Sequence, residues 1–282
     1  MDKYREEGTT VWMPRSAAEY VGNTRTSVPR YSASPNMKLG PYATPPPSSA
    51  TARSNCILLA RSWQGPSMTC GRPRASRSVQ SPGETESLKA GISDLANDAQ
   101  SVINALELKS YVIVGHSMGG KTAQLLASRR PAGLAGLVLV APSPPSPTVL
   151  PKEQREALLH AYDTHESVAH VRDHILTAAP LTDTQKERVI EDSLRGAPAA
   201  KQAWPTQAML EDIRSDAHRI NVPTLVLSGE RDQVDPTSRL REEVLPCISG
   251  SQLQVLPHTG HLPMLEAPEA VARAIRQFVA KL

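Results

Sequence analysis

One serine in the chain, Ser117, lies in a pattern typical of nucleophilic catalysis. It is the centre of Gly115-His116-Ser117-Met118-Gly119, which directly follows the apolar run 111–114 and directly precedes a helical pattern at 119–129. A Gly-x-Ser-x-Gly turn between a strand and a helix exposes the serine hydroxyl, and its glycines let the two backbones approach closely. The backbone N–H of Met118, at the start of the helix, is suited to hold an oxyanion. The pattern therefore predicts that Ser117 is a nucleophile, the alternative being a serine that only caps the helix.

A serine hydroxyl is a weak nucleophile and needs a carboxylate-oriented base. Downstream of Ser117, Asp232 lies in the loop that follows the apolar run 223–228, where a sheet strand is expected to end. Because the carboxyl ends of parallel strands meet at one edge, this loop is expected to lie near Ser117. Glu230 and Asp235 in the same loop, and Asp183 further upstream, are the competing carboxylates, with Asp235 the main rival.

The predicted base is His261, in the loop after the last apolar run, 253–256. Gly260 before it allows a close backbone approach, which favours His261 over its neighbour His258. Four other downstream histidines lie in helical patterns and are expected to be solvated or to line a pocket; they are His160, His165, His170 and His174.

Apolar periodicity from residue 89 onward predicts alternating helices and strands. Helical spacing covers 92–108 and 119–129, and short buried runs cover 111–114 and 136–140. Later the alternation resumes with strands at 223–228 and 253–256 and helices at 236–244 and 268–281. This order is typical of an α/β fold with a mostly parallel sheet flanked by helices.

A block of helical patterns interrupts this alternation over about residues 145–218, after the proline-rich stretch 142–147. It contains helices at about 152–163, 166–178, 182–195 and 200–214, the third opened by a Thr182/Gln185 capping box. Such a block is expected to form a helical lid over a pocket. His116, Trp204 and Met209 are the candidate substrate-binding residues, and Lys121 is expected to be a solvated helix residue.

Residues 1–88 differ in composition from the rest of the chain. They are rich in Ser, Pro, Arg and Thr and contain little apolar periodicity, so they are predicted to be a divergent, largely disordered segment before a domain at 89–282. Only residues 56–60 resemble a strand. The N-terminal strands of the sheet are therefore expected to be degenerate or missing.

Charge and cysteine content exclude several classes of protein. The net charge is +3, and of 31 Lys and Arg against 28 Asp and Glu, the first 90 residues hold 12 against 6. This small excess does not imply a nucleic-acid partner. Three widely spaced cysteines form no disulfide framework or metal motif, so no metal and no cofactor are expected. The sequence contains no apolar run long enough for a membrane span, and its N-terminus lacks the apolar stretch of a signal peptide. We therefore expect a soluble, cytoplasmic protein with no membrane partner.

Three motifs in this order resemble those of the α/β-hydrolase superfamily, in particular its small esterases, lactonases and cofactor-free haloperoxidase-like enzymes. They are the runs 114–120, 225–232 and 260–266, the last followed by Pro268. The resemblance covers about residue 92 to the C-terminus and implies a Ser117–His261–Asp232 triad, an acyl-enzyme, and a small carboxylic ester or lactone as substrate.

The family also carries a His-Gly loop upstream that completes the oxyanion hole. The first histidine of this chain is His116, so no His-Gly pair precedes the turn at Ser117. The sequence therefore does not identify the second oxyanion donor. The alternatives to an active esterase are an inactive or truncated homologue and a non-catalytic binding protein on the same fold.

Overall fold

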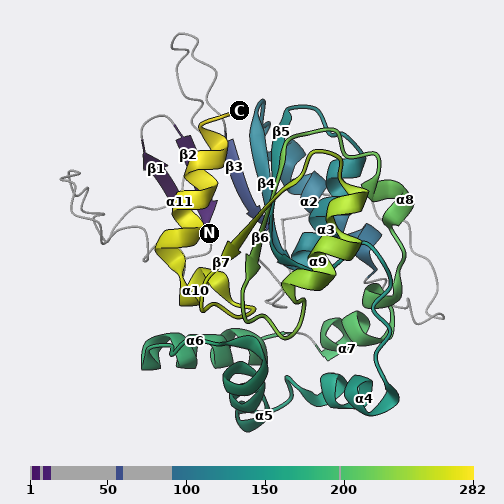
Figure 1. Ribbon diagram of the computed structural model, residues 1–282, viewed down its shortest axis with the longest axis vertical. Helices are drawn as coiled ribbons and strands as arrows, with labels where there is room; N and C mark the ends of the chain where they lie inside the picture. The colour runs from purple at the N-terminus through teal and green to yellow at the C-terminus, as the bar shows by residue number, and fades with distance from the viewer. Residues whose placement is uncertain (1, 7–8, 14–54, 60–90, 197) are drawn as a thin grey trace, which may run out of the picture.

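The computed structural model describes residues 2–6, 9–13, 55–59 and 91–282 except 197. A twisted sheet forms the centre of this part of the chain, with helices on both faces and a helical block at one end (Figure 1). Its strands, in spatial as well as chain order, are β1 (Asp2–Glu6), β2 (Thr9–Met13), β3 (Asn55–Leu59), β4 (Tyr111–Ser117), β5 (Leu134–Pro142), β6 (Thr224–Gly229) and β7 (Gln252–Leu256). Only β1 and β2 pair antiparallel; all other neighbours are parallel.

The central strands are buried on both faces because their apolar side chains alternate between two cores. Tyr111 and Ile113 of β4 point into one core, and Val112 and Val114 into the other. The first core is covered by α2 (Ile92–Ala105), α3 (Met118–Ser128) and α9 (Thr237–Glu243), and the second by α11 (Pro268–Val279). This confirms the predicted mostly parallel sheet flanked by helices.

Two of the three N-terminal strands were not predicted from the sequence. Residues 55–59 form β3, close to the expected strand at 56–60, and Ile57 pairs with Ile113 of β4. β1 and β2 add a hairpin at the outer edge of the same sheet. The rest of the segment 1–88 lies outside the described residues, and the domain boundary at 88/89 stays a prediction.

All of the predicted helical block except its last helix forms a layer beyond the carboxyl ends of the strands, the lower layer in Figure 1; the last helix lies higher, beside α3. We call residues 145–218 the helical insertion. Its elements are α4 (Lys152–His160), α5 (His165–Val171), a π-helical turn (Arg172–Leu176), α6 (Asp183–Leu194), α7 (Pro198–Thr206), a 3-10 turn (Ala208–Leu210) and α8 (Arg214–Ala217). Thr182 and Gln185 form the expected capping box at the start of α6.

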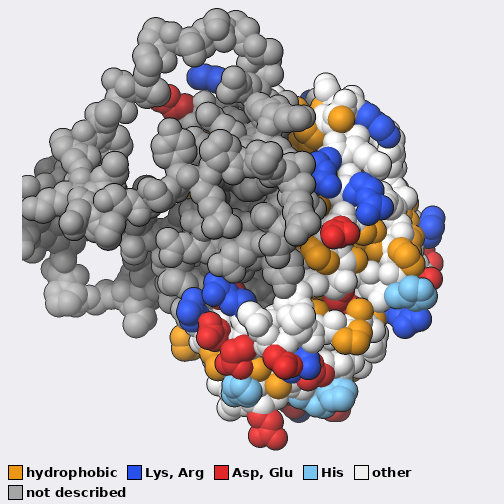
Figure 2. Space-filling model, turned by 90° about the vertical axis from the view of Figure 1, so that its left-hand side faces the viewer, with side chains coloured by type: hydrophobic (Ala, Val, Ile, Leu, Met, Phe, Trp, Pro, Cys, Tyr) orange, Lys and Arg blue, Asp and Glu red, His pale blue; other side chains and the backbone are white. Residues whose placement is uncertain are grey.

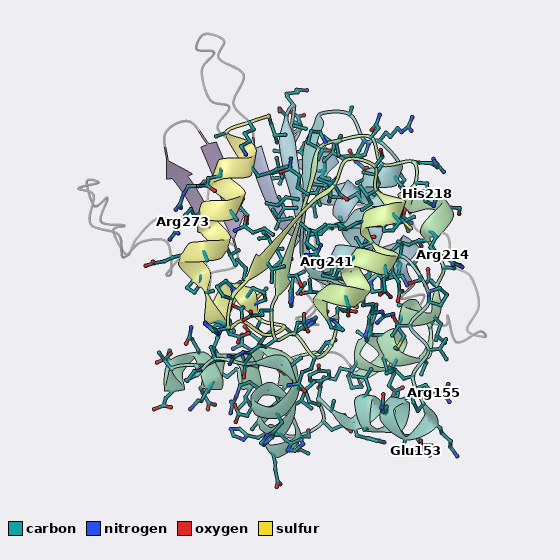
Figure 3. The ribbon with its side chains drawn as sticks, in the orientation of Figure 1. Glu153, Arg155, Arg214, His218, Arg241 and Arg273 are labelled. Carbon is teal, nitrogen blue, oxygen red and sulfur yellow. The ribbon has the colours of Figure 1, made fainter. Side chains whose placement is uncertain are left out.

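The outer surface of the insertion carries many charged side chains, with exposed hydrophobic side chains such as Val149 among them. Charged side chains of both signs and histidines gather there (Figure 2), and Glu153 and Arg155 of α4 point away from the molecule (Figure 3). His160, His165, His170 and His174 are exposed, as the sequence pattern indicates. Among the described residues, no helix is long and apolar enough to cross a membrane.

Lys121 departs from its predicted environment. The expected solvated helix residue is completely buried in α3, and its ammonium donates to the carbonyls of Ser146 (3.1 Å) and Met209 (3.4 Å). Burial lowers the pKa of this lysine to about 8. Ser146 and Met209 lie near the two ends of the insertion. The hydrogen bonds of Lys121 therefore connect both ends to α3, the helix that follows Ser117.

Candidate functional site

The turn at Ser117 has the strained geometry that its spacing predicts. Ser117 ends β4 and precedes α3, and its backbone has a φ of 51°, unusual for a residue with a side chain. A Cβ added at Gly115 would lie 2.4 Å from the carbonyl oxygen of Gly119 and 2.7 Å from the Cβ of Ala123. The tight packing of strand on helix therefore requires glycine at 115 and fixes the position of the serine.

Three side chains, one at the end of β4 and one each in the loops after β6 and β7, form one hydrogen-bonded chain at the carboxyl edge of the sheet. The Ser117 hydroxyl lies 2.8 Å from His261 Nε2, and His261 Nδ1 lies 2.8 Å from Asp232 Oδ2. The other carboxylate oxygen of Asp232 accepts the backbone N–H groups of Val234 (2.8 Å) and Asp235 (3.1 Å). All three side chains are buried, so this chain of hydrogen bonds is shielded from bulk water.

The competing carboxylates and the competing histidine have other contacts. Asp235 accepts from Ser143 (3.3 Å) and pairs with Arg239 (3.2 Å). Glu230 accepts the backbone N–H of His258, whose exposed ring lies beside Arg231. Asp183 is fully exposed on α6, beside Lys186. Of these candidates, the structure brings Asp232 and His261 into hydrogen-bonding distance in line with Ser117.

The electrostatic surroundings of His261 favour a basic imidazole. Burial by itself lowers the pKa of His261, but the hydrogen bond and negative charge of Asp232, with the charges of Asp235 and Glu266, outweigh it and raise the pKa above its ordinary value. With Nδ1–H donated to Asp232, Nε2 is left to accept the Ser117 proton. This arrangement can activate a serine hydroxyl for attack on a carbonyl.

Met118 is the first residue of α3, so its backbone N–H has no acceptor one turn earlier in the helix. This is the position expected for an oxyanion-hole donor. On the other side of β4, Leu59 at the end of β3 pairs with Gly115. The segment that follows β3, residues 60–90, lies outside the described part of the chain.

His116 supports the loop of His261. Its Nε2 lies 2.7 Å from the carbonyl oxygen of His261, and the two rings are 5.1 Å apart. Burial, and then the neighbouring His261, lower the pKa of His116 to about 3, so the ring is neutral and can donate Nε2–H to that carbonyl. This contact was not foreseen from the sequence, which predicted substrate binding for His116.

The other two predicted substrate-binding residues belong to the packing of the insertion. Trp204 of α7 is half-buried against the core that contains α2 and α3. Met209 is buried, and its carbonyl accepts from Lys121 and from the backbone N–H of Thr148 (2.8 Å). A contribution of either side chain to a substrate pocket stays a prediction.

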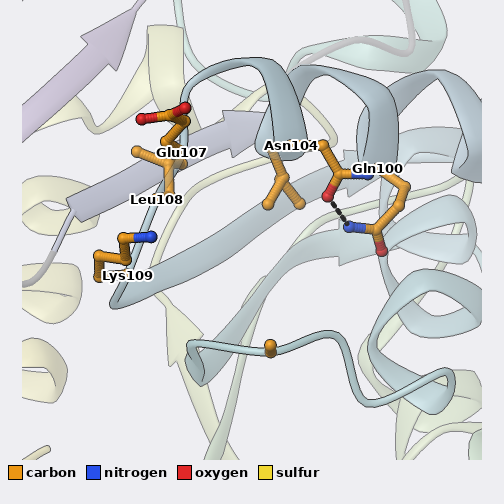
Figure 4. Close-up of a pocket in the computed structure, with 7 residues that line it drawn as sticks. Gln100, Asn104, Glu107, Leu108 and Lys109 are labelled. Atoms are coloured by element: carbon orange, nitrogen blue, oxygen red, sulfur yellow. Dashed lines mark hydrogen bonds between the residues drawn. The ribbon is translucent and has the colours of Figure 1, made fainter.

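A separate pocket lies at the opposite edge of the sheet and is not part of this site. Its lining includes Gln100 and Asn104 of α2, joined by a hydrogen bond, and Lys109 just before β4 begins (Figure 4). Since Ser117 lies at the other end of β4, this pocket is remote from the hydrogen-bonded chain.

Known proteins with similar sequences include esterases, lipases and a haloperoxidase. The model of the alpha/beta hydrolase family matches residues 47–274. The pimeloyl-(acyl-carrier protein) methyl ester esterase of Neisseria meningitidis is 28% identical over 71% of this chain and 67% of its own length. The sn-1-specific diacylglycerol lipase ABHD11 of Mus musculus is 29% identical over 66% of this chain and 64% of its own.

Solved structures of known proteins have a similar fold. An esterase from Exiguobacterium antarcticum superposes with a TM-score of 0.63 at 22% identity, covering 70% of this chain and 76% of that one. The two curated relatives are matched over about two thirds of their length. The resemblance seen in the sequence motifs begins at about residue 92. The match of the family model begins earlier, at residue 47, and includes β3. The chain belongs to the α/β-hydrolase family.

Proposed function

We propose that this protein is a serine hydrolase that cleaves a small carboxylic ester or lactone through an acyl-enzyme. The observation that carries the proposal is the buried hydrogen-bonded chain from Ser117 through His261 to Asp232. The esterase and lipase among the relatives support the reaction class.

Each half of the proposed reaction moves one proton through His261. The Ser117 oxygen attacks the carbonyl carbon while Nε2 takes its proton, and the Met118 N–H stabilises the oxyanion. Asp232 stabilises the imidazolium, which then protonates the leaving alkoxide and leaves the acyl group on Ser117. Water attacks this ester with His261 again as base, and collapse of the second tetrahedral intermediate releases the carboxylic acid and restores Ser117. For a lactone, the alcohol stays joined to the acyl group through the carbon chain, and the last step releases a single hydroxy acid.

The helical insertion is proposed to act as a lid over this site. It lies beyond the carboxyl ends of the strands (Figure 1), and its residue Leu176 accepts a hydrogen bond from the backbone of His261. A layer in this position encloses the substrate between the insertion and the sheet edge. Small esters and lactones are therefore the substrates that we expect.

The proposal predicts burst kinetics with p-nitrophenyl acetate. Mixing full-length protein with excess substrate is expected to release about one p-nitrophenol per site rapidly, followed by slower steady turnover, whenever hydrolysis of the acyl-enzyme is the slower step. Stopped-flow absorbance measures both phases, and a panel of p-nitrophenyl butyrate and simple lactones gives the substrate range. A folded protein that turns over none of these compounds would support the inactive homologue instead.

A further inference from the structure

The carboxylate of Glu266 joins the loop of His261 to the helical insertion. Glu266 is the last residue of α10 (Pro263–Glu266), which lies between α11 and the insertion helices (Figure 1). Its Oε2 accepts the backbone N–H groups of Ala178 (2.7 Å), Ala179 (2.9 Å) and Gly260 (3.0 Å). Its Oε1 accepts those of Gly260 and Leu262, both at 3.1 Å. One side chain thus holds four backbone donors from two segments that are far apart in the sequence.

The two segments held by Glu266 meet at His261 itself. Gly260 and Leu262 are its immediate neighbours in the chain, and the His261 N–H donates to the carbonyl of Leu176 (2.8 Å). A Cβ at Gly260 would lie 2.8 Å from the backbone nitrogen of Ala178, so the segments are in close backbone contact. With His116 bound to its carbonyl, the backbone of His261 is held from several sides.

Only a carboxylate fits this arrangement of donors. Both oxygens accept N–H groups, so a glutamine at 266 would turn its NH2 group toward donors on one side. Hydrogen bonds to a charged acceptor are also stronger than those to a neutral one. Either the insertion segment or the His261 loop would lose its acceptor in such a variant.

We propose that Glu266 is a positioning residue, which keeps His261 within hydrogen-bonding distance of Ser117 and ties that distance to the position of the insertion segment 176–179. The inference rests on the proposed function, in which His261 is the base. Its physical basis is that misplacing a reacting group by about 1 Å can cost about 100-fold in rate.

The charge of Glu266 also affects the protonation of His261. The ionisable groups that act on His261 are Asp232 and Asp235 from the loop after β6, His116 from β4 and Glu266 from α10. Glu266 contributes to the raised pKa of His261, so removing its charge lowers that pKa. The neutral imidazole is the reactive form, and the acid limb of kcat/KM therefore moves to lower pH when the charge is lost.

The test compares Glu266→Gln with Glu269→Gln, which removes the same charge from an exposed position on α11. We expect Glu266→Gln to lower kcat for p-nitrophenyl acetate by about 10- to 100-fold with KM changed less than about threefold, and to move the acid limb to lower pH. Glu269→Gln is expected to change neither. Burst amplitude counts the competent sites. If Glu266→Gln fails to fold, Glu266→Asp takes its place; it keeps the charge and is expected to retain the wild-type acid limb.

A second measurement separates this proposal from the proposed function. Heteronuclear NMR follows the titration of the His261 ring directly, without turnover, and is expected to show a lower pKa in Glu266→Gln but not in Glu269→Gln. If the wild type has no esterase activity but this shift is found, the reaction is wrong and the coupling of Glu266 to His261 stands. If Glu266→Gln only lowers Tm, with kcat per competent site, the acid limb and the His261 titration unchanged, Glu266 is merely structural and the inference is overturned.

Discussion

Ser117→Ala is expected to lower kcat for p-nitrophenyl acetate by about five to six orders of magnitude. The reason is that Ser117 Oγ is the atom proposed to bond to the acyl carbon, and no acyl-enzyme forms without it. His261 and Met118 stay in place in this variant, so the residual rate measures their contribution to direct attack by water. Steady-state assays of the purified variant, with circular dichroism and Tm as checks on folding, give the result.

Ser128→Ala is the matched control for this variant. Ser128 is also buried and belongs to the same helix, α3, but its hydroxyl donates only to the nearby carbonyl of Leu125 (2.7 Å). We expect its kcat to stay within about threefold of wild type, since a neutral local hydrogen bond contributes only about 1 kcal/mol, and to stability rather than to the reaction. A Ser117→Ala variant with activity comparable to that of this control would contradict the assignment of the nucleophile.

Asp232→Asn is expected to have the second largest effect, about a 10⁴-fold loss of kcat. The amide group can donate to Nδ1 of His261, and this favours the tautomer that carries its proton on Nε2, where the Ser117 proton must go. The pH profile changes as well. In the wild type the raised pKa of His261 makes kcat/KM fall as the pH is lowered through that value. Without the charge of Asp232, burial dominates, the pKa drops, and the acid limb of the residual activity moves to lower pH.

Asp235→Asn distinguishes Asp232 from its closest rival. Burial raises the pKa of Asp235 to about 6, and its carboxylate contacts Ser143 and Arg239. Because Asp235 acts on His261 only through its charge, we expect Asp235→Asn to lower kcat less than about tenfold, with a smaller shift of the acid limb than in Asp232→Asn. A loss in Asp235→Asn larger than that in Asp232→Asn would show that the orienting carboxylate was assigned to the wrong residue. Parallel pH–rate profiles of both variants decide this.

Features set by local sequence could be predicted. Helices α2, α3 and α11 and strands β4 to β7 follow from apolar periodicity, because each must bury one face or both. The turn at Ser117 follows from its glycines and from its place between a strand and a helix. Asp232 and His261 follow from their positions after the last two strands, since parallel strands bring such loops to one edge. Their hydrogen bonds to one another are a property of the fold that the order of motifs alone only suggests.

Contacts between distant segments could not be predicted. The local helical pattern suggests an exposed lysine at 121. Lys121 is buried because carbonyls 25 and 88 residues away in the chain accept hydrogen bonds from its ammonium group. Glu266 stands at the end of a motif that the sequence singles out, but its partners Ala178 and Ala179 lie in the insertion. The strand β2 left a signal that was missed, since Thr9-Thr10-Val11-Trp12 is a short β-branched and aromatic run.

The most direct test of the central claim is to locate the residue that a fluorophosphonate probe modifies. The Ser117 oxygen is expected to attack phosphorus and displace fluoride, with His261 taking the serine proton, and this leaves a stable phosphonyl ester. Tryptic digestion and mass spectrometry should then find the added mass on Ser117 within the peptide 110–121, and should find none in Ser117→Ala. Folded wild-type protein that stays unlabelled, or that carries the label at another residue, would contradict the proposal that Ser117 is an activated nucleophile.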